Sequence, residues 1–196
     1  MRQIETPHGP ARVEVRATRG ARAALLLGHG AGGGIAAPDL AVTAEAAASE
    51  TFSVVLVEQP YRVAGRRSPS PARQLDAAWR AVVEELRDRE LRDMALVVGG
   101  RSSGARVACR TAAETGAAAV LCLAFPLEPP RSGSRLDELD AVAVPTLVVQ
   151  GSRDPFGIPP SRPRRTVAVV QGDHALKADL DGVAAAVGAW LRGLEL

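Results

Sequence analysis

The chain has 196 residues, of which 46% are hydrophobic, 23% charged and 3% aromatic, with 19 glycines and 14 prolines. This length and composition are typical of a globular protein, so we expect a single domain over residues 1–196 and exclude collagen-like repeats and extended disorder. The net charge is only +2, with no basic tract and few aromatic side chains for stacking, so we expect no nucleic-acid partner.

The N-terminal segment predicts neither export nor membrane insertion. It lacks the apolar core of a signal peptide, and the longest uncharged apolar run in the chain, Ala117 to Leu127, has 11 residues. A membrane span needs about 18. Cys109 and Cys122 both lie in apolar stretches and are expected to be buried thiols. We therefore expect a soluble, cytoplasmic protein that makes no membrane contact.

The first 17 residues alternate between apolar and polar side chains, which is the period of half-buried strands. We expect strands at Gln3–Thr6 and Ala11–Ala17. In the second strand Val13 and Val15 share one face, and the charged residues between them share the other. The two strands predict an antiparallel hairpin.

The rest of the chain alternates short apolar runs with segments of helical spacing. Runs of four to six residues rich in Val and Leu are typical of strands that are buried on both faces. We expect such strands at Ala23–Leu27, Ser53–Val57, Ala95–Val98, Ala119–Ala124, Pro145–Val149 and Thr166–Val170. We expect helices at Pro38–Glu50, from the Ser70 cap to Leu86, at Ser103–Glu114, at Ser134–Leu139 and at Leu180–Leu194. This alternation predicts a mostly parallel sheet with helices on both faces and the hairpin at one edge.

The segment Gly100-Arg-Ser-Ser-Gly104 matches G-x-S-x-G, in which a serine occupies a sharp turn between a strand and a helix. Glycines two residues before and after Ser102 remove side chains that would collide with the neighbouring strand and helix. The helix N-terminus places free N–H groups where negative charge would develop on an acyl substrate. The alternative is an ordinary tight turn without a catalytic serine.

A catalytic serine needs a base, and the base needs a carboxylate to orient it. His174 follows the last expected strand, and Asp154 follows the strand before it. Ser102, Asp154 and His174 thus follow three different parallel strands, so their side chains should meet at one edge of the sheet. The chain order Ser–Asp–His is that of the α/β-hydrolase arrangement. Taken singly, Asp154 is also typical of a turn and His174 of a loop.

The glycine-rich segment Gly28-His-Gly-Ala-Gly-Gly-Gly34 follows the strand at Ala23–Leu27. Acyl transfer needs two N–H donors for the oxyanion, and such a loop supplies one of them. We expect the backbone N–H groups of Ala31 and Ser103 to form this oxyanion hole. His29 is expected to brace the loop.

The same loop supports a competing hypothesis. Gly28, Gly30 and Gly33 satisfy G-x-G-x-x-G after a strand, and Glu58 ends the next strand, which is the outline of a dinucleotide-binding fingerprint. However, Pro38 places the next helix too far along the chain for its N-terminus to hold a pyrophosphate. The sequence contains no metal-ligand spacing, and we expect neither a cofactor nor a metal.

Several motifs together resemble a known family. The segments G-H-G-A-G-G-G, G-G-R-S-S-G-A-R, F-P-L-E-P-P, V-V-Q-G-S-R-D-P-F-G and G-D-H are similar to those of the small α/β-hydrolases of the testis-expressed protein 30 and NSL-complex subunit 3 type, which are related to dienelactone hydrolases. The resemblance implies the α/β-hydrolase fold, with Ser102, Asp154 and His174 as the triad positions. Dienelactone hydrolases use a cysteine nucleophile, so the serine here argues against lactone hydrolysis.

These features predict a serine hydrolase that cleaves small carboxylic esters or thioesters and works as a monomer or homodimer. The interval of 19 residues from Pro126 to Val144 has room for a loop and one short helix, so we expect no cap domain. Arginines at the expected active edge, above all Arg101 and Arg62, are candidates for binding an anionic substrate, and the others are Arg66, Arg67 and Arg131. The alternative to an enzyme is a non-catalytic scaffold with the same fold.

Overall fold

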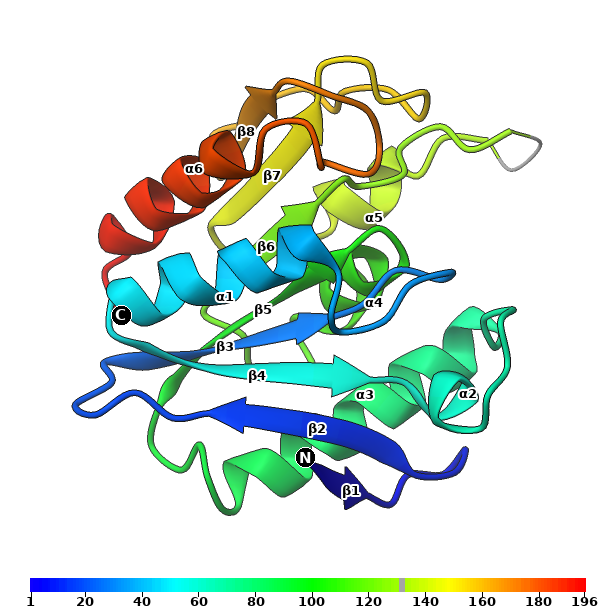
Figure 1. Ribbon diagram of the computed structural model, residues 1–196, viewed down its shortest axis with the longest axis vertical. Coiled ribbons are helices and arrows are strands. Elements are labelled where there is room, and N and C mark those ends of the chain that lie inside the picture. Colours follow the sequence, from blue (N-terminus) through cyan, green and yellow to red (C-terminus); the bar gives the residue numbers. More distant parts are fainter. Residues whose placement is uncertain (131–132) are drawn as a thin grey trace.

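The computed structural model of the chain describes residues 1–130 and 133–196. Within these residues, eight strands form one sheet in the order β1-β2-β4-β3-β5-β6-β7-β8 (Figure 1). The strands are β1 (Arg2–Ile4), β2 (Ala11–Arg16), β3 (Ala23–Gly28), β4 (Phe52–Glu58), β5 (Ala95–Arg101), β6 (Ala119–Leu123), β7 (Thr146–Gly151) and β8 (Arg165–Val170).

The predicted N-terminal hairpin is confirmed and lies at one edge of the sheet. Strands β1 and β2 are antiparallel, with Gln3 opposite Arg12, and β2 is antiparallel to β4. Every other pair of neighbouring strands is parallel. Val13 is fully buried, so the apolar face of the hairpin is the one that faces the core.

The helices are close to those that the spacing predicts, with differences at their ends. They are α1 (Pro38–Ser49), α2 (Pro60–Val63), α3 (Ala72–Arg87), α4 (Ser103–Thr111), α5 (Leu136–Asp140) and α6 (Leu180–Arg192). Helix α3 has Pro71, and not Ser70, at its N-cap position. Helix α2 was not predicted, because four residues are too few to show a helical period. None of the described helices is long and apolar enough to cross a membrane.

The side chains of the apolar strands pack in two separate cores, because successive side chains of a strand point to opposite faces of the sheet. Leu25 and Leu27 of β3 lie in the core beneath α1 and α6, whereas Leu26 lies in the core with α3 and α4. Figure 1 shows α1 and α6 in front of the sheet and α3 and α4 behind it. Cys109 and Cys122 are buried free thiols in the second core, as expected.

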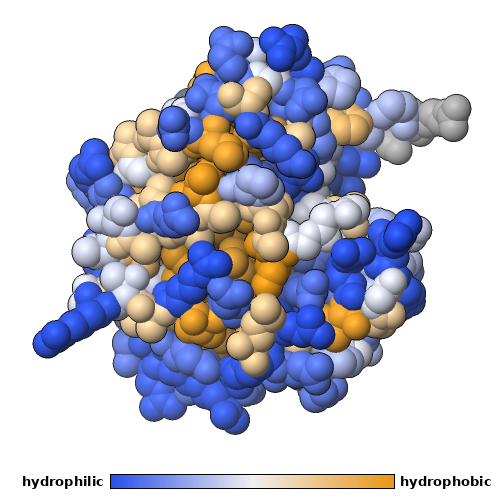
Figure 2. Space-filling view, viewed as in Figure 1, coloured by the Kyte–Doolittle hydropathy of each residue, from blue (hydrophilic) through white to orange (hydrophobic). Residues whose placement is uncertain are grey.

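Helices α1 and α6 pack against each other as well as against the sheet. Figure 2 shows that apolar side chains reach the surface mainly across the middle of this face, over α1 and α6, and that hydrophilic side chains surround them. Partly buried members of this region include Val42, Ala46, Ala186 and Trp190.

The position of the site follows from the strand order. The chain passes from β3 to β4 on one side and then returns to place β5 on the other side of β3. Gly28 at the end of β3 is paired with Gly100 of β5, so the loops that follow these two strands leave the sheet next to each other. In open α/β sheets such a reversal of strand order opens a crevice at the carboxyl ends of the strands.

Candidate active site

Ser102 occupies the turn between β5 and α4, with backbone angles of φ 52° and ψ −106°. A positive φ is unusual for a residue with a side chain and costs about 1–3 kcal/mol. Two hydrogen bonds hold the turn in place: Ser102 N donates to the Leu123 carbonyl of β6 (2.9 Å), and Arg106 N donates to the Ser102 carbonyl (3.2 Å). The turn therefore projects Ser102 beyond the sheet edge in a conformation that the surroundings enforce.

The two glycines of the motif are required by close backbone contacts. A Cβ at Gly100 would lie 2.4 Å from the Gly28 carbonyl oxygen, and one at Gly104 would lie 2.3 Å from the same atom. These collisions involve backbone rather than a movable side chain. The close approach of β3 to the start of α4 is thus possible only with glycine at both positions.

We expect Gly104→Ala to lower the free energy of unfolding by about 3 kcal/mol or more, because the new methyl group overlaps the Gly28 carbonyl. For a chain of this length, thermal unfolding should then move down by at least about 6 °C. The matched control is Gly188→Ala in α6, where a Cβ meets only Glu50 Oε1 at 3.8 Å. This change should leave the midpoint unchanged or raise it. Equal melting of Gly104→Ala and the unmodified protein would contradict the steric account.

The structure brings the side chains of Ser102, His174 and Asp154 together in one chain of hydrogen bonds. His174 Nε2 lies 2.9 Å from Ser102 Oγ, and His174 Nδ1 lies 2.8 Å from Asp154 Oδ2. The Asp154 side chain is completely buried, while 19% of the His174 side chain is exposed. This is the geometry in which a base can remove the serine proton while a buried carboxylate holds the imidazole.

Two further residues fix the carboxylate and the imidazole. Gln150 Nε2 donates to Asp154 Oδ2 (2.8 Å) and also lies near the carbonyls of Phe125 (3.1 Å) and Gly157 (2.9 Å). Phe156 N donates to Asp154 Oδ1 (2.9 Å). The Phe156 ring packs edge-on against the His174 ring, with 4.5 Å between the ring centroids. Neither residue is among the site residues predicted from the sequence. The one signal for Gln150 is that it is a polar residue inside an apolar strand.

The glycine loop after β3 is braced from within the protein. His29 is buried, its Nδ1 donates to the Gly30 carbonyl (2.8 Å), and its Nε2 accepts from Gln59 N (3.0 Å). Burial lowers the pKa of His29, so the ring stays neutral. Tyr61 Oη donates to the Ala31 carbonyl (2.9 Å). His29 thus has both ring nitrogens engaged, and Tyr61 is a bracing residue that the sequence analysis missed.

The expected oxyanion donors lie beside Ser102. Ala31 and Ser103 line the same pocket as Ser102 and His174. Within residues 1–130 and 133–196, neither of their backbone N–H groups donates a hydrogen bond to another protein atom. Both donors are therefore available to an oxygen atom bound at this position.

Arg101 connects the nucleophile turn to two other segments. Its Nε lies 2.9 Å from Asp39 Oδ2, and its Nη2 donates to the His174 carbonyl (3.0 Å). Asp39, in the first turn of α1, is only 1% exposed, and burial raises the pKa of its carboxyl against the opposing effect of Arg101. A Cβ at Gly30 would lie 2.6 Å from Arg101 Nη1, so glycine there makes room for the guanidinium. The predicted substrate-binding residue is thus already engaged with protein partners.

The pocket at Ser102 has a volume of about 410 Å³. It is formed by residues from the segments that follow β3, β4, β5, β6 and β7 and by the His174 loop. Its lining consists of Ala31, Gly32, Pro69, Arg101, Ser102, Ser103, Arg106, Pro126, Pro129, Arg135, Phe156 and His174. Arg62 is not part of the described lining; its guanidinium lies near the Arg66 carbonyl instead (3.4 Å). Arg131 lies outside the described residues.

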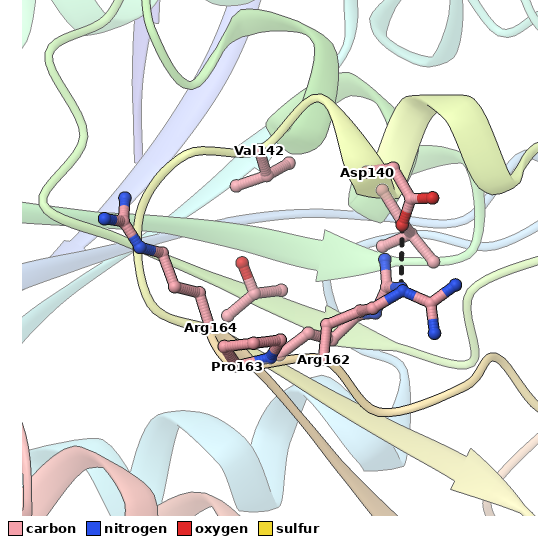
Figure 3. A pocket seen from close by; sticks show the side chains of 8 residues that line it. Asp140, Val142, Arg162, Pro163 and Arg164 are labelled. Carbon is pink, nitrogen blue, oxygen red and sulfur yellow. Dashed lines mark hydrogen bonds and ion pairs between the residues drawn. The ribbon is translucent and has the colours of Figure 1, made fainter.

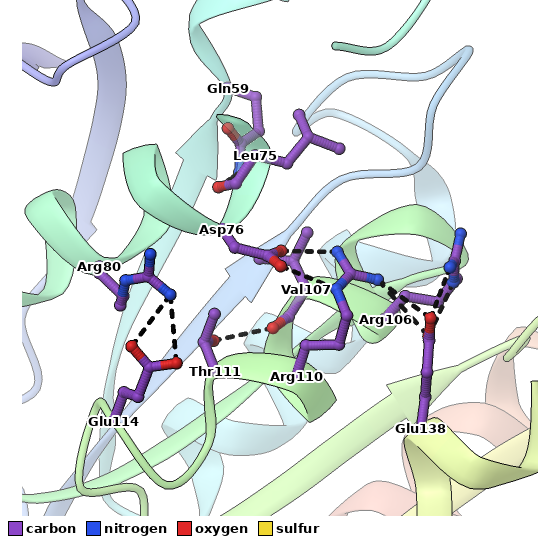
Figure 4. A network of polar contacts seen from close by, with 10 residues as sticks. All are labelled: Gln59, Leu75, Asp76, Arg80, Arg106, Val107, Arg110, Thr111, Glu114 and Glu138. Atoms are coloured by element: carbon purple, nitrogen blue, oxygen red, sulfur yellow. Dashed lines mark hydrogen bonds and ion pairs between the residues drawn. The ribbon is translucent and has the colours of Figure 1, made fainter. Parts of the chain in front are cut away.

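Two pocket arginines, Arg106 and Arg135, were not among the sequence candidates. Arg106 belongs to a network that joins α3, α4 and α5 (Figure 4). Its guanidinium donates twice to Glu138 (2.8 and 2.5 Å), and Arg110 lies between Glu138 and Asp76, with which it makes two short hydrogen bonds (2.6 and 2.8 Å). The network fixes the short helix α5 beside the pocket.

The arginines of the loop before β8 lie away from Ser102. Arg162, Arg164 and Arg165 line a separate pocket of about 390 Å³ together with Asp140 and Thr146. Thr146 and Arg165 are the first residues of β7 and β8, so this pocket is at the amino ends of the strands, opposite the edge of Ser102. Figure 3 shows Arg162 and Arg164 pointing in different directions, and Arg165 Nη2 is paired with Asp140 (2.8 Å).

The residues that suggested dinucleotide binding have other roles in the structure. Helix α1 begins at Pro38, well after the glycine loop, as expected. Glu58 Oε2 lies 3.1 Å from Arg12 Nη1 on the neighbouring strand, so this carboxylate is paired within the sheet. Among the described residues, no group of three or more His, Cys, Asp or Glu side chains lies close enough to hold a metal ion.

Comparisons with known proteins agree with this architecture. Residues 21–180 match the model of a family described as an alpha/beta hydrolase domain. No curated protein matches the chain. Similar solved structures include an a/b serine hydrolase without lid from Xanthomonas campestris, with a TM-score of 0.76 and 21% identity over 97% of this chain and 92% of that chain.

Two further solved structures are similar over nearly the whole chain. Est1E from Butyrivibrio proteoclasticus, with ferulic acid bound, has a TM-score of 0.78 at 14% identity and covers 97% of this chain and 98% of that one. Dienelactone hydrolase from Anabaena variabilis has a TM-score of 0.76 at 17% identity, and the match covers 96% of this chain and 94% of that chain. At such identities the likeness shows the fold, and it confirms the predicted one. Since the family model spans most of the chain, the protein belongs to the alpha/beta hydrolase family.

Proposed function

We propose that this hydrolase cleaves small carboxylic esters or thioesters through an acyl-enzyme formed on Ser102. The observation that carries the proposal is the continuous contact from Ser102 Oγ through the His174 ring to the buried Asp154, at the mouth of an open pocket. The similarity to a solved a/b serine hydrolase and to the esterase Pf2001 of Pyrococcus furiosus supports the same activity.

In the first step, His174 Nε2 takes the Ser102 hydroxyl proton as Oγ forms a bond to the carbonyl carbon. The negative charge on the carbonyl oxygen is held by the N–H groups of Ala31 and Ser103, each typically worth about 3 kcal/mol in the transition state. The bond to the leaving alcohol or thiol then breaks, and this group departs with the proton from His174.

In the second step, water attacks the acyl-enzyme and His174 takes a proton from it. The bond between Ser102 Oγ and the acyl carbon breaks, the carboxylic acid leaves, and the proton returns to Ser102. Asp154 keeps His174 Nδ1 protonated throughout and stabilises the imidazolium.

The test is hydrolysis of a panel of short-chain 4-nitrophenyl esters, matched acetyl thioesters and an anilide by the 196-residue chain. We expect multiple turnovers on esters or thioesters, with shorter acyl chains preferred because the pocket is small. A folded protein with no turnover on any of these substrates would contradict the proposal and favour the scaffold alternative.

Three narrower predictions complete the proposal. The motifs favour the testis-expressed protein 30 type of α/β-hydrolase within the family. We infer that residues 1–196 act as one domain, as a monomer or homodimer. The partner expected at the site is a small-molecule acyl substrate.

A further inference from the structure

The pocket at Ser102 is lined by cationic side chains and, among its described residues, by no acidic one. Three arginines contribute to it: Arg101, Arg106 and Arg135. Two of them are paired with carboxylates that are not part of the pocket lining: Arg101 with Asp39, and Arg106 with Glu138. Their charges are therefore compensated by the protein itself.

Arg135, which precedes α5, differs from the other two. Its Nη1 lies 3.4 Å from the Pro126 carbonyl, and no ion pair to Arg135 is found within residues 1–130 and 133–196. The two residues outside that range, Arg131 and Ser132, carry no carboxylate. Arg135 is thus a cation at the pocket that makes no ion pair of its own with the described residues.

The neighbouring carboxylates already form ion pairs with other arginines. Glu138 pairs with Arg106 and Arg110, and Asp76 pairs with Arg110. Burial alone would raise the pKa of Glu138, but its contacts with Arg106 and Arg110, and the more weakly acting charge of Arg135, hold it below its usual value, so Glu138 stays ionised and paired. Burial and repulsion from Arg106 lower the pKa of Arg135 against the opposing effect of Glu138, although an arginine remains charged at neutral pH. The cluster therefore carries one positive charge in excess beside the pocket.

We propose that Arg135 binds a free carboxylate of the substrate, so that the preferred esters carry a carboxylate in addition to the scissile bond. The planar guanidinium suits this role because it can donate two parallel hydrogen bonds to a carboxylate. The inference rests on the proposed function, since it names the substrate class for the same site. It also replaces Arg101 and Arg62, the residues that the sequence suggested for an anionic substrate, with Arg135.

The experiment compares kcat/KM within two matched pairs of substrates. 4-Nitrophenyl hydrogen glutarate against 4-nitrophenyl valerate places the carboxylate on the acyl part, and 3-carboxyphenyl butyrate against phenyl butyrate places it on the leaving group. For the unmodified chain we expect the charged member of one pair to be preferred about tenfold or more, with a preference that falls as salt is added. The preferred pair identifies the side of the scissile bond that faces Arg135.

The variants are Arg135→Gln, Arg135→Lys and, as a matched control, Arg67→Gln, an exposed arginine outside the pocket lining. Arg135→Gln should abolish the preference, lowering kcat/KM for the charged ester about tenfold more than for its neutral partner. Arg135→Lys should restore part of the preference because it keeps the charge but not the fork geometry. Arg67→Gln should behave like the unmodified chain.

Two results would overturn the inference: neutral and charged esters cleaved equally well by the unmodified chain, or Arg135→Gln slowing both members of a pair alike. The salt-dependent preference of the unmodified chain is measured without any variant, so a poorly folded variant does not prevent the test. Turnover itself tests the proposed function separately, because the absence of turnover on all four esters would overturn that function, whereas equal turnover of the charged and neutral members overturns only the role of Arg135.

Discussion

Ser102→Ala is expected to lower kcat for ester hydrolysis by about 10⁴-fold or more while leaving the fold intact. The methyl group cannot form an acyl-enzyme, and His174 loses the hydroxyl that lies 2.9 Å from its Nε2. The strained turn is held by backbone contacts, from Ser102 N to Leu123 and from Arg106 N to Ser102, so the alanine should adopt it as well. Initial rates with a short 4-nitrophenyl ester and a thermal melt of the same sample measure both effects.

The matched control for this variant is Ser68→Ala, which makes the same change at an exposed serine outside the pocket lining. It should keep the full rate. Residual hydrolysis by Ser102→Ala within tenfold of the unmodified chain would mean that the pocket works through a bound water molecule or that another residue is the nucleophile.

Asp154→Asn is expected to have the second-largest effect on activity, a loss of about 10³- to 10⁴-fold in kcat. The carboxylate of Asp154 receives three donors: His174 Nδ1 and Gln150 Nε2 at Oδ2, and Phe156 N at Oδ1. An asparagine amide group has to face one of these donors with N–H groups of its own. It therefore either drives His174 into the wrong tautomer or leaves buried donors without acceptors.

The control is Asp173→Asn, which makes the same change next to His174. Asp173 is exposed, and its Oδ1 accepts only from Ala175 N (2.9 Å) among the described contacts. We expect its kcat to stay within a few-fold of the unmodified chain. An equal loss in both variants would show that general disturbance of the His174 loop, and not orientation by Asp154, causes the effect.

The fold was largely predictable because its signals are local. Each buried strand is a continuous run of apolar residues, such as Ala23–Leu27, and runs of this kind predict a parallel sheet between helices. The order of Ser102, Asp154 and His174 after successive strands then places the three residues at one edge, as the distances among them show. Periodicity was least informative for short elements, which is why α2 was missed.

The supporting residues of the site were not predictable because their contacts join segments far apart in the chain. Tyr61 reaches the Ala31 carbonyl across 30 positions, and Arg101 reaches the His174 carbonyl across 73. Arg135 stands out only once the neighbouring carboxylates are known to be paired elsewhere. The position of the arginines before β8, in contrast, could be inferred from the sequence. They directly precede a strand, and residues that precede a parallel strand lie at the opposite edge of the sheet from residues that follow it.

The proposed mechanism requires Ser102 to be an activated nucleophile, which intact mass spectrometry after treatment with a fluorophosphonate can detect. The unmodified chain should gain one adduct, because the phosphonate forms a covalent bond only with a serine whose proton a nearby base can remove. Ser102→Ala should gain none, and His174→Ala should react far more slowly. A folded, unmodified chain that gains no adduct, or an adduct that persists in Ser102→Ala, would contradict the assignment of Ser102.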